Sequence, residues 1–221
     1  IDTETSSLDA HQADLIGVSL STKIGKACYI PIGHNSGGCI KKEIVIKKLK
    51  TLLEDKSVKK IGQNIKFDFI VLNNHGIEMS SMEDTMLMSY VLDAGKNRHN
   101  MDTLSEIHLN HKTISFKELV GSGKNQINFN EVELNKAMEY AAEDADITYR
   151  LYKIFNKNLK LEKLTNIYEI FEKPLIKILA FMEIKGIKVD SKFLEKLSIK
   201  FKKKIKDLEK EIFKISKKEF N

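Results

Sequence analysis

AMEYAAEDADITYRLY (Ala137–Tyr152) has the pattern of a helix that presents a tyrosine and an aspartate to one site. At about 100° per residue, Tyr140 and Asp144 lie about 40° apart and one turn from each other, whereas Asp146 lies about 240° round the helix from Tyr140. Asp144 therefore shares the face of the tyrosine, and Asp146 does not. Taken by itself, the pattern also fits an amphipathic surface helix whose acidic side chains face water.

Two further acidic residues open the sequence in Ile1–Thr5, IDTET. Strand alternation puts Asp2 and Glu4 on one face of a strand and Ile1 and Thr3 on the other. Adjacent carboxylates repel each other, and one of them binds a proton near neutral pH unless a cation neutralises the pair. The pair therefore indicates a metal site, although an exposed strand edge also tolerates two acids.

A fourth acidic residue, Asp68, follows the predicted strand Val58–Ile61 and stands at the start of the predicted helix Phe69–Asn74. A carboxylate at this place can cap the helix or complement its dipole, a contribution of about 0.3 to 1 kcal/mol. The junction between a strand and a helix is also where α/β sheets commonly hold catalytic groups. Both interpretations of Asp68 remain open at this point.

An α/β sheet can bring Asp2, Glu4, Asp68 and Asp144 to one site. Ligands that are all oxygen suit Mg²⁺ or Mn²⁺ rather than zinc. Two such ions about 4 Å apart stabilise both the attacking and the leaving oxygen at a phosphorus centre. The four acids therefore predict phosphodiester hydrolysis with two divalent cations.

The remaining pattern predicts an α/β domain followed by helices without strands. β-branched runs separated by a turn at Lys23–Lys26 predict an antiparallel meander. Its strands and the helices that follow are expected at Asp14–Leu20, Ala27–Ile32, Lys42–Glu54, Glu83–Leu92, Asp102–Asn110, Phe116–Val120 and Glu131–Phe155. Further along, Ile167–Ile184 is apolar at helical spacing, and Asp190 or Ser191 caps a lysine-rich helix that reaches about Lys217.

The last predicted helix carries an apolar stripe at a spacing of three and four residues, so it requires a packing partner, and the preceding helix is the nearest one. The stripe consists of Leu194, Leu197, Phe201, Ile205, Leu208, Ile212 and Ile215. We therefore expect a domain over residues 1–164 and a helical hairpin over residues 165–221.

The composition is that of a soluble globular protein, with 42% apolar and 31% charged residues. No apolar run approaches the roughly 18 residues of a membrane span, and no signal peptide opens the sequence. Because Cys28 and Cys39 are the two cysteines, neither a disulfide framework nor a cysteine zinc site is expected. These features predict a cytoplasmic protein without a membrane partner.

The net charge of +6 hides an asymmetry along the chain. Residues 1–150 carry 18 Lys and Arg against 21 Asp and Glu, whereas residues 151–221 carry 19 against 10. The basic tail is suited to bind a nucleic-acid backbone, and the acidic body is suited to bind a cation. Because 35 of the 37 basic residues are Lys, a general bias toward lysine is the alternative explanation.

Three acidic motifs occur in the order that resembles the exonuclease motifs of the DEDD superfamily, tyrosine type. They are D-x-E at Asp2–Glu4, the segment Asn64–Asp68 and Y-x-x-x-D at Tyr140–Asp144. The wider sequence resembles the proofreading domain of bacterial DNA polymerase I at Arg98–Asp102, His111–Ile114, Gly123–Gln126 and Tyr140–Asp146. The tail from Phe171 to Asn221 resembles the lead-in to the polymerase thumb of the same family.

This resemblance implies an RNase H-like mixed sheet with flanking helices. It also implies a 3′-to-5′ exonuclease that releases nucleoside 5′-monophosphates from single-stranded or frayed DNA 3′ ends. Asp2, Glu4, Asp68 and Asp144 would hold two divalent cations, Mg²⁺ or Mn²⁺, and Tyr140 with Glu4 would orient the attacking water.

The resemblance further implies five residues that bind the substrate. Leu8 would wedge between the last bases, and Phe116 would stack on one of them. Gln63 and Asn64 would bind the terminal nucleotide, and Arg98 would approach phosphate. For Leu8 and Phe116, a place in the hydrophobic core is the alternative.

Two departures from the family limit this interpretation. The sequence begins one residue before Asp2, so the strand that carries Asp2 and Glu4 is expected to lack its upstream half. Nothing in the sequence resembles the palm aspartates or the nucleotide-binding helix of the polymerase. No polymerisation is therefore expected of this chain, and a polymerase domain in cis or in trans is an expected partner.

Two other functions remain open. The first is a non-catalytic structural or DNA-binding module of a truncated DNA polymerase I, against which the intact acids argue. The second is an RNA-trimming relative with the same site, against which Arg98–Phe129 and the thumb-like tail argue.

Overall fold

The computed structural model describes residues 1–219, apart from the side chain of Lys124. Phe220 and Asn221, with which the thumb-like tail ends, lie outside the described residues. The chain divides into two compact units, Ile1–Ile184 and Lys185–Asn221. Within the described part of the chain, no helix combines the length and the apolar character that crossing a membrane requires.

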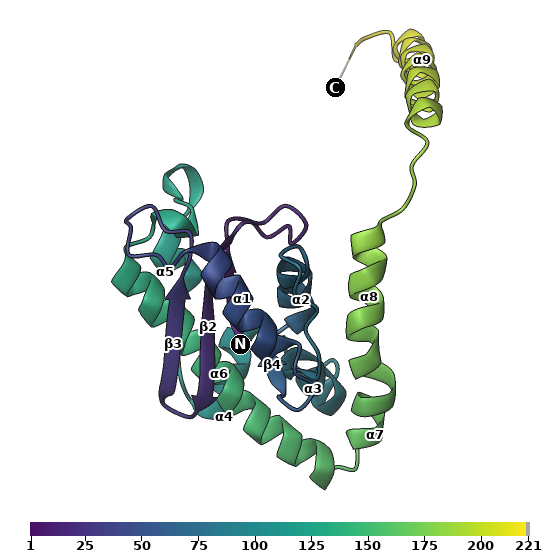
Figure 1. The fold of residues 1–221 in the computed structure, drawn as a ribbon. Helices are drawn as coiled ribbons and strands as arrows, with labels where there is room; N and C mark the ends of the chain where they lie inside the picture. Colours follow the sequence, from purple (N-terminus) through teal and green to yellow (C-terminus); the bar gives the residue numbers. More distant parts are fainter. Residues whose placement is uncertain (220–221) are drawn as a thin grey trace. The chain divides into compact units, whose positions relative to one another are not determined.

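Short strands lie at the centre of the first unit and form a three-stranded sheet and a two-stranded sheet (Figure 1). They are β1 (Asp2–Thr5), β2 (Leu15–Lys23), β3 (Lys26–Pro31), β4 (Lys60–Gly62) and β5 (Met82–Asp84). β1, β2 and β3 pair antiparallel in that order, which confirms the predicted meander, and β4 pairs with β5 in parallel. The amino group of Ile1 donates a hydrogen bond to the carbonyl oxygen of Ile61 at 2.7 Å, so β1 lies beside β4.

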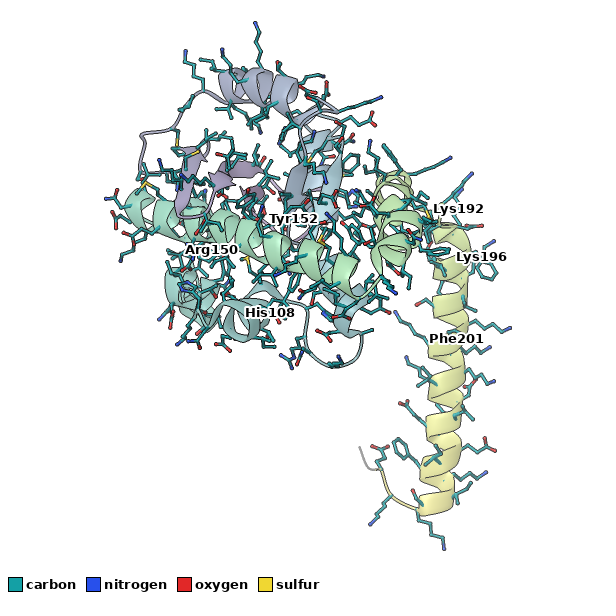
Figure 2. All side chains as sticks on the ribbon, turned by 90° about the horizontal axis from the view of Figure 1, so that it is seen from below. His108, Arg150, Tyr152, Lys192, Lys196 and Phe201 are labelled. Carbon is teal, nitrogen blue, oxygen red and sulfur yellow. The ribbon has the colours of Figure 1, made fainter. Side chains whose placement is uncertain are left out.

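Helices flank the strands on both sides. They are α1 (Lys42–Leu53), α2 (Ile65–Asn73), α3 (Thr85–Asp93), α4 (Met101–Leu109), α5 (Phe116–Val120) and α6 (Leu134–Leu161). α1 and α6 cover opposite faces of the antiparallel sheet, as Figures 1 and 2 show together. The core under α1 and α2 includes Leu49, Leu53 and Phe69, and a second cluster joins α3 and α4 to α6.

Asp84 explains two differences from the sequence-based prediction. α2 begins at Ile65, ahead of the predicted start at Phe69, and the predicted helix from Glu83 begins instead with strand β5. The buried carboxylate of Asp84 accepts hydrogen bonds from the backbone amides of Asn64 at 3.1 Å, Ile65 at 3.0 Å and Met86 at 2.8 Å. These amides would otherwise lack partners at the two helix starts. One side chain therefore caps both α2 and α3.

The segment after α6 belongs to the first unit. It consists of α7 (Thr165–Ile167), a π-helical turn over Tyr168–Glu172 and α8 (Lys173–Lys185). The wide turn directly precedes Pro174, which has no amide hydrogen to donate within a helix. Tyr168, Ile176 and Ala180 are buried in the core, so the compact unit extends to Ile184, beyond the predicted boundary at residue 164.

The second unit is built on α9 (Ser191–Ser216). The side chain of Asp190 accepts a hydrogen bond from the amide of Phe193 at 2.9 Å, which confirms the predicted cap. The apolar stripe of α9, which includes Phe201, is exposed apart from the half-buried Leu197, and Lys192 and Lys196 also project from this helix (Figure 2). Packing of α9 against the preceding helix stays a prediction.

Candidate active site

Three carboxylates meet where β1 passes α6. Asp2 and Glu4 alternate along β1, and Asp144 extends from α6. Each of the three offers an oxygen, and these oxygens all lie within 4.8 Å of one another. The structure therefore brings together the two acids of the first motif and the aspartate of the third, as predicted.

These carboxylates are costly to ionise without a cation. Glu4 is 6% exposed and Asp144 is 4% exposed. Burial raises the pKa of both carboxyls well above the usual range, and repulsion from Asp2 raises it further. Burial also raises the pKa of Asp2 to about 6.

One oxygen of the cluster has no partner. Glu4 Oε1 is buried and receives no hydrogen bond from the described residues. A buried acceptor left without a partner costs about 1 to 3 kcal/mol, and more when it is charged. A hard cation bound to the three carboxylates would satisfy this oxygen and cancel the repulsion. The donor set therefore fits Mg²⁺ or Mn²⁺.

Asp68 lies close enough to the cluster for its charge to act on both Asp2 and Glu4. It is 2% exposed, and its Oδ1 accepts hydrogen bonds from the backbone amide of Thr3 at 2.8 Å and from Thr3 Oγ1 at 2.6 Å. Burial and the charge of Asp2 raise its pKa well above the usual range. Asp68 is thus a neighbour of Asp2 rather than a member of the three-acid group. The role of Thr3 had no signal in the sequence beyond its place between two acids.

Tyr140 shares the face of Asp144, as the helical spacing predicts. Its hydroxyl donates a hydrogen bond to Asp144, and burial together with the nearby carboxylates raises the pKa of the phenol far above neutral pH. Asp146 faces elsewhere: it accepts hydrogen bonds from the amide of Gly25 at 2.7 Å and from Arg150 Nε at 2.8 Å. Asp146 therefore anchors the β2–β3 turn and takes no part in the cluster.

Phe116 and Leu8 lie outside the core. Leu8 is 94% exposed and Phe116 is 42% exposed, so the alternative that placed them in the core is wrong. The ring of Phe116 stacks within 3° of parallel on the buried ring of Phe129 at 6.4 Å between centroids, and lies 6.1 Å from the ring of Tyr140. An exposed aromatic ring therefore stands beside the carboxylate cluster.

The other three predicted binding residues differ in their contacts. Gln63 is engaged at both ends of its amide, because its Nε2 donates to the carbonyl of His99 at 2.7 Å and its Oε1 accepts from Thr85 Oγ1. Asn64 is exposed and holds a left-handed backbone conformation with φ of 58°. Arg98 is exposed. Asn64 and Arg98 are accessible to a ligand, whereas Gln63 fixes the segment that precedes α4.

Tyr29 and His34 form a pair that the sequence did not indicate. The hydroxyl of Tyr29 lies 2.7 Å from His34 Nε2, and His34 is 7% exposed. Burial, and then the charge of Glu4, raise the pKa of Tyr29. Gly17, which pairs with Glu4 in the sheet, lies under the Tyr29 ring: a Cβ at Gly17 would lie 2.1 Å from the Tyr29 hydroxyl oxygen.

Gly17→Ala is therefore expected to destabilise the protein by about 1 to 3 kcal/mol, because overpacking forces the ring or the strand to move. Chemical denaturation measures the effect. Adding Tyr29→Leu should recover part of the loss, since the smaller side chain makes room and the two changes are then not additive. An unchanged free energy of unfolding in Gly17→Ala would mean that the ring moves without cost.

The carboxylate cluster also predicts a pH dependence of stability. Asp2, with a pKa of about 6, and Glu4, Asp68 and Asp144, with pKa values well above their usual range, hold their protons more tightly in the folded chain than in the unfolded chain. This contribution is present in full below about pH 4 and is lost as the pH rises through 6 and above. Without metal, the melting temperature should fall between pH 5 and pH 8.

Mg²⁺ or Mn²⁺ should restore stability at pH 8 and have little effect at pH 5, because the cation binds the ionised carboxylates. Differential scanning fluorimetry with and without metal measures both trends. Asp2→Asn/Asp144→Asn is the control variant, and in it both the pH dependence of the melting temperature and the effect of metal should be smaller. A metal-free protein that is more stable at pH 8 than at pH 5 would contradict the repulsive cluster.

Solved structures with a similar fold identify the class. The POL domain of Pol1 from M. smegmatis, in complex with DNA primer-template and dNTP, matches with a TM-score of 0.78 and 20% identity over 99% of this chain and 34% of that chain. Brucella melitensis NrnC bound to pGG matches with a TM-score of 0.65 and 25% identity over 86% of this chain and 88% of that chain. These likenesses show the fold, which is the RNase H-like exonuclease fold, and in this chain β1 and α6 of that fold hold the carboxylate cluster.

A family model described as 3′-5′ exonuclease matches residues 1–160, and the chain belongs to this family. DNA polymerase I of Rhizobium leguminosarum is 44% identical over 241 residues, which cover 100% of this chain and 24% of that protein. The chain spans about a quarter of the length of the curated relatives that it matches. The predicted resemblance to the exonuclease domain of bacterial DNA polymerase I is thereby confirmed.

Proposed function

We propose that the chain is a 3′-to-5′ exodeoxyribonuclease that depends on two divalent cations and removes nucleoside 5′-monophosphates from single-stranded or frayed DNA 3′ ends. The observation that carries this proposal is the group of three carboxylates within 4.8 Å, with Asp68 beside Asp2. Membership in the 3′-5′ exonuclease family supports the direction of hydrolysis.

Asp2, Glu4 and Asp144 would hold one cation, and Asp68 with Asp2 would hold the second. The bound ions, Mg²⁺ or Mn²⁺, would neutralise charge on the attacking and leaving oxygens of the phosphate. A water molecule attacks phosphorus, and the bond from phosphorus to the 3′ oxygen breaks. One proton of the water ends on that 3′ oxygen, so a nucleoside 5′-monophosphate is released and the shortened DNA ends in a new 3′ hydroxyl. 

Tyr140 orients the attacking water and does not act as a base. The raised pKa of the phenol keeps its proton on the hydroxyl, and that proton is donated to Asp144. The hydroxyl oxygen can then accept a hydrogen bond from the water. Glu4 is the second group that can orient this water, because its Oε1 receives no hydrogen bond from the described residues.

The preference for unpaired ends is assigned to Leu8 and Phe116. The scissile phosphate reaches a buried carboxylate site only if the last nucleotides are unpaired, which costs a few kcal/mol. A base stacked on an aromatic ring recovers about 1 to 3 kcal/mol regardless of its identity. The exposed Phe116 ring and the exposed Leu8 side chain fit these two tasks. Asn64 and Arg98 are proposed to bind the terminal nucleotide and its phosphate, and Gln63 is proposed to support them by holding the segment that carries Arg98 and His99.

Wild-type protein should degrade a mismatched or single-stranded 3′ end faster than a matched one, and Phe116→Ala should reduce that preference by about tenfold. Rates on matched, mismatched and single-stranded 5′-labelled oligonucleotides measure it. A lysine-depleted α9, with Lys192→Gln, Lys196→Gln and Lys203→Gln, is the control, because a basic helix adds a salt-dependent term that treats all ends alike. If this control erases the preference and Phe116→Ala does not, the assignment of the preference for unpaired ends to Phe116 is wrong.

The same assay separates the other functions. Equal or faster degradation of RNA of the same sequence favours an RNA-trimming enzyme. Binding of DNA without hydrolysis in Mg²⁺ or Mn²⁺ favours a non-catalytic module that serves a polymerase domain in cis or in trans. 

A further inference from the structure

Glu143 precedes Asp144 on α6 and binds a different part of the chain. Its Oε2 accepts a hydrogen bond from the backbone amide of Ile114 at 2.6 Å, and its Oε1 lies 2.7 Å from His111 Nε2. The Glu143 side chain is only 18% exposed. Both carboxylate oxygens are thus committed to one short segment, His111–Ile114.

This segment has no regular secondary structure and connects α4 to α5. At its start, Ser105 Oγ donates to the carbonyl of His111 at 2.8 Å. In its middle, Thr113 Oγ1 donates to Asp102 at 2.7 Å. Both of these contacts hold it to α4. Glu143 supplies the contacts that hold it to α6.

Phe116 follows directly from the held segment. Ser115 and Glu118 form a capping box that starts α5 at Phe116, two residues after the amide that Glu143 binds. The position of Ile114 therefore sets where the Phe116 ring meets the ring of Tyr140, 6.1 Å away. Tyr140 and Glu143 belong to the same helix, so α6 carries both the ring that Phe116 meets and the carboxylate that holds the segment before Phe116.

We propose that Glu143 is a positioning residue that places Phe116 against the water-orienting Tyr140 and the metal-binding Asp144. The proposal rests on the proposed function, because it assigns base stacking to Phe116. A carboxylate is suited to the task because it accepts two hydrogen bonds from two donors, and charge-assisted hydrogen bonds are the stronger ones. In Glu143→Gln the remaining oxygen can accept from Ile114, but the NH2 group faces the Nε2–H of His111 and breaks that contact unless the imidazole changes its tautomer, and the charge of the carboxylate is lost in either case.

The test uses single-stranded oligonucleotides that end either in an ordinary nucleotide or in an abasic nucleotide at the 3′ end. Both ends present the same phosphodiester to the carboxylates, but only the ordinary one has a base to stack. Glu143→Gln should lower kcat/KM on the ordinary end by about tenfold, as loss of one stacking contact does. On the abasic end its kcat/KM should stay within about twofold of wild type.

Glu139→Gln is the matched control, since Glu139 is exposed, lies one turn earlier on α6 and loses the same charge. It should behave as wild type on both ends. The double variant Glu143→Gln/Phe116→Ala should be no slower than Phe116→Ala alone, because both changes remove the same contribution, which is stacking of the terminal base on Phe116. His111→Ala, which removes one of the two contacts, gives a smaller loss in the same pattern and replaces Glu143→Gln if that variant does not fold.

Equal losses on both ends, or additive losses in the double variant, would overturn the positioning role, because the effect would then act on the carboxylates or on the whole fold. These outcomes leave the proposed function intact, since wild type still hydrolyses both ends. Wild-type protein that hydrolyses neither end in Mg²⁺ or Mn²⁺ overturns the proposed function, and the positioning role with it.

Discussion

Asp144→Ala is expected to lower metal-dependent hydrolysis by about 10³-fold or more, because it removes a ligand shared with Asp2 and Glu4 at distances within 4.8 Å. Asp2→Ala, Glu4→Ala and Asp68→Ala should have comparable effects. Without metal, the Asp2, Glu4 and Asp144 variants should be unchanged or slightly more stable, since each removal relieves repulsion among buried carboxylates. Asp68→Ala should be less stable than these, because it leaves two donors of Thr3 without an acceptor. Initial rates on a single-stranded oligonucleotide, with thermal melting in EDTA, measure both expectations.

Asp146→Asn is the matched control for Asp144→Ala. Asp146 lies on the same helix, but its carboxylate binds the amide of Gly25 and the side chain of Arg150 instead of the cluster. This variant should lose some stability and keep nearly all of its turnover. Retention of Mg²⁺-dependent cleavage in Asp144→Ala would refute the assignment of the cluster as the catalytic metal site.

Tyr140→Phe is expected to slow turnover by about 10²- to 10⁴-fold, with little change in DNA affinity. The variant keeps the ring that contacts Phe116 and Phe129, and it loses the hydroxyl that bonds Asp144. A hydroxyl that orients water acts mainly in the transition state, so kcat should fall and the dissociation constant should not. Single-turnover rates and fluorescence anisotropy separate the two.

Tyr149→Phe provides the comparison, because Tyr149 is a half-buried tyrosine of the same helix. Its side chain lines an apolar cavity together with residues of β2 and β4. It should keep wild-type turnover. If Tyr140→Phe also keeps it, Tyr140 is part of the aromatic packing and nothing more.

Local periodicity was enough to predict the parts of the site that share one element. Alternation along β1 paired Asp2 with Glu4, and the helical repeat put Tyr140 and Asp144 on one face and Asp146 on another. The structure confirms these relations because a strand of four residues and a helix of 28 residues each hold a regular backbone. The resemblance to a known family then supplied the order of the motifs.

Contacts between distant segments could not be predicted in this way. The three-residue strand β5 is too short for a periodic signal, and Asp84 reaches back to the amides of Asn64 and Ile65 across about twenty positions. The bonds from Thr3 to Asp68 likewise join two elements that the sequence separates. Such contacts depend on how the elements pack, and no local pattern encodes that packing.

The extent of the first unit also depends on contacts between distant segments that no local pattern predicts. Thr165–Ile184 has an apolar helical pattern that gives no sign of its partner, and it was grouped with the tail. In the structure, Lys173 Nζ lies 2.7 Å from the buried carboxylate of Glu83, and Tyr168 donates to Glu83 at 3.0 Å. These contacts fix the segment to β5. An exonuclease domain that ends at residue 164 stays a prediction.

The most direct test of the proposed catalytic site is degradation of a 5′-labelled single-stranded oligonucleotide with a free or a blocked 3′ end, in Mg²⁺ and in EDTA. The account predicts stepwise shortening of the free end in Mg²⁺, release of nucleoside 5′-monophosphates, and no reaction on the blocked end or in EDTA. Equal shortening of the blocked oligonucleotide, internal cleavage, or no reaction with either Mg²⁺ or Mn²⁺ would contradict it.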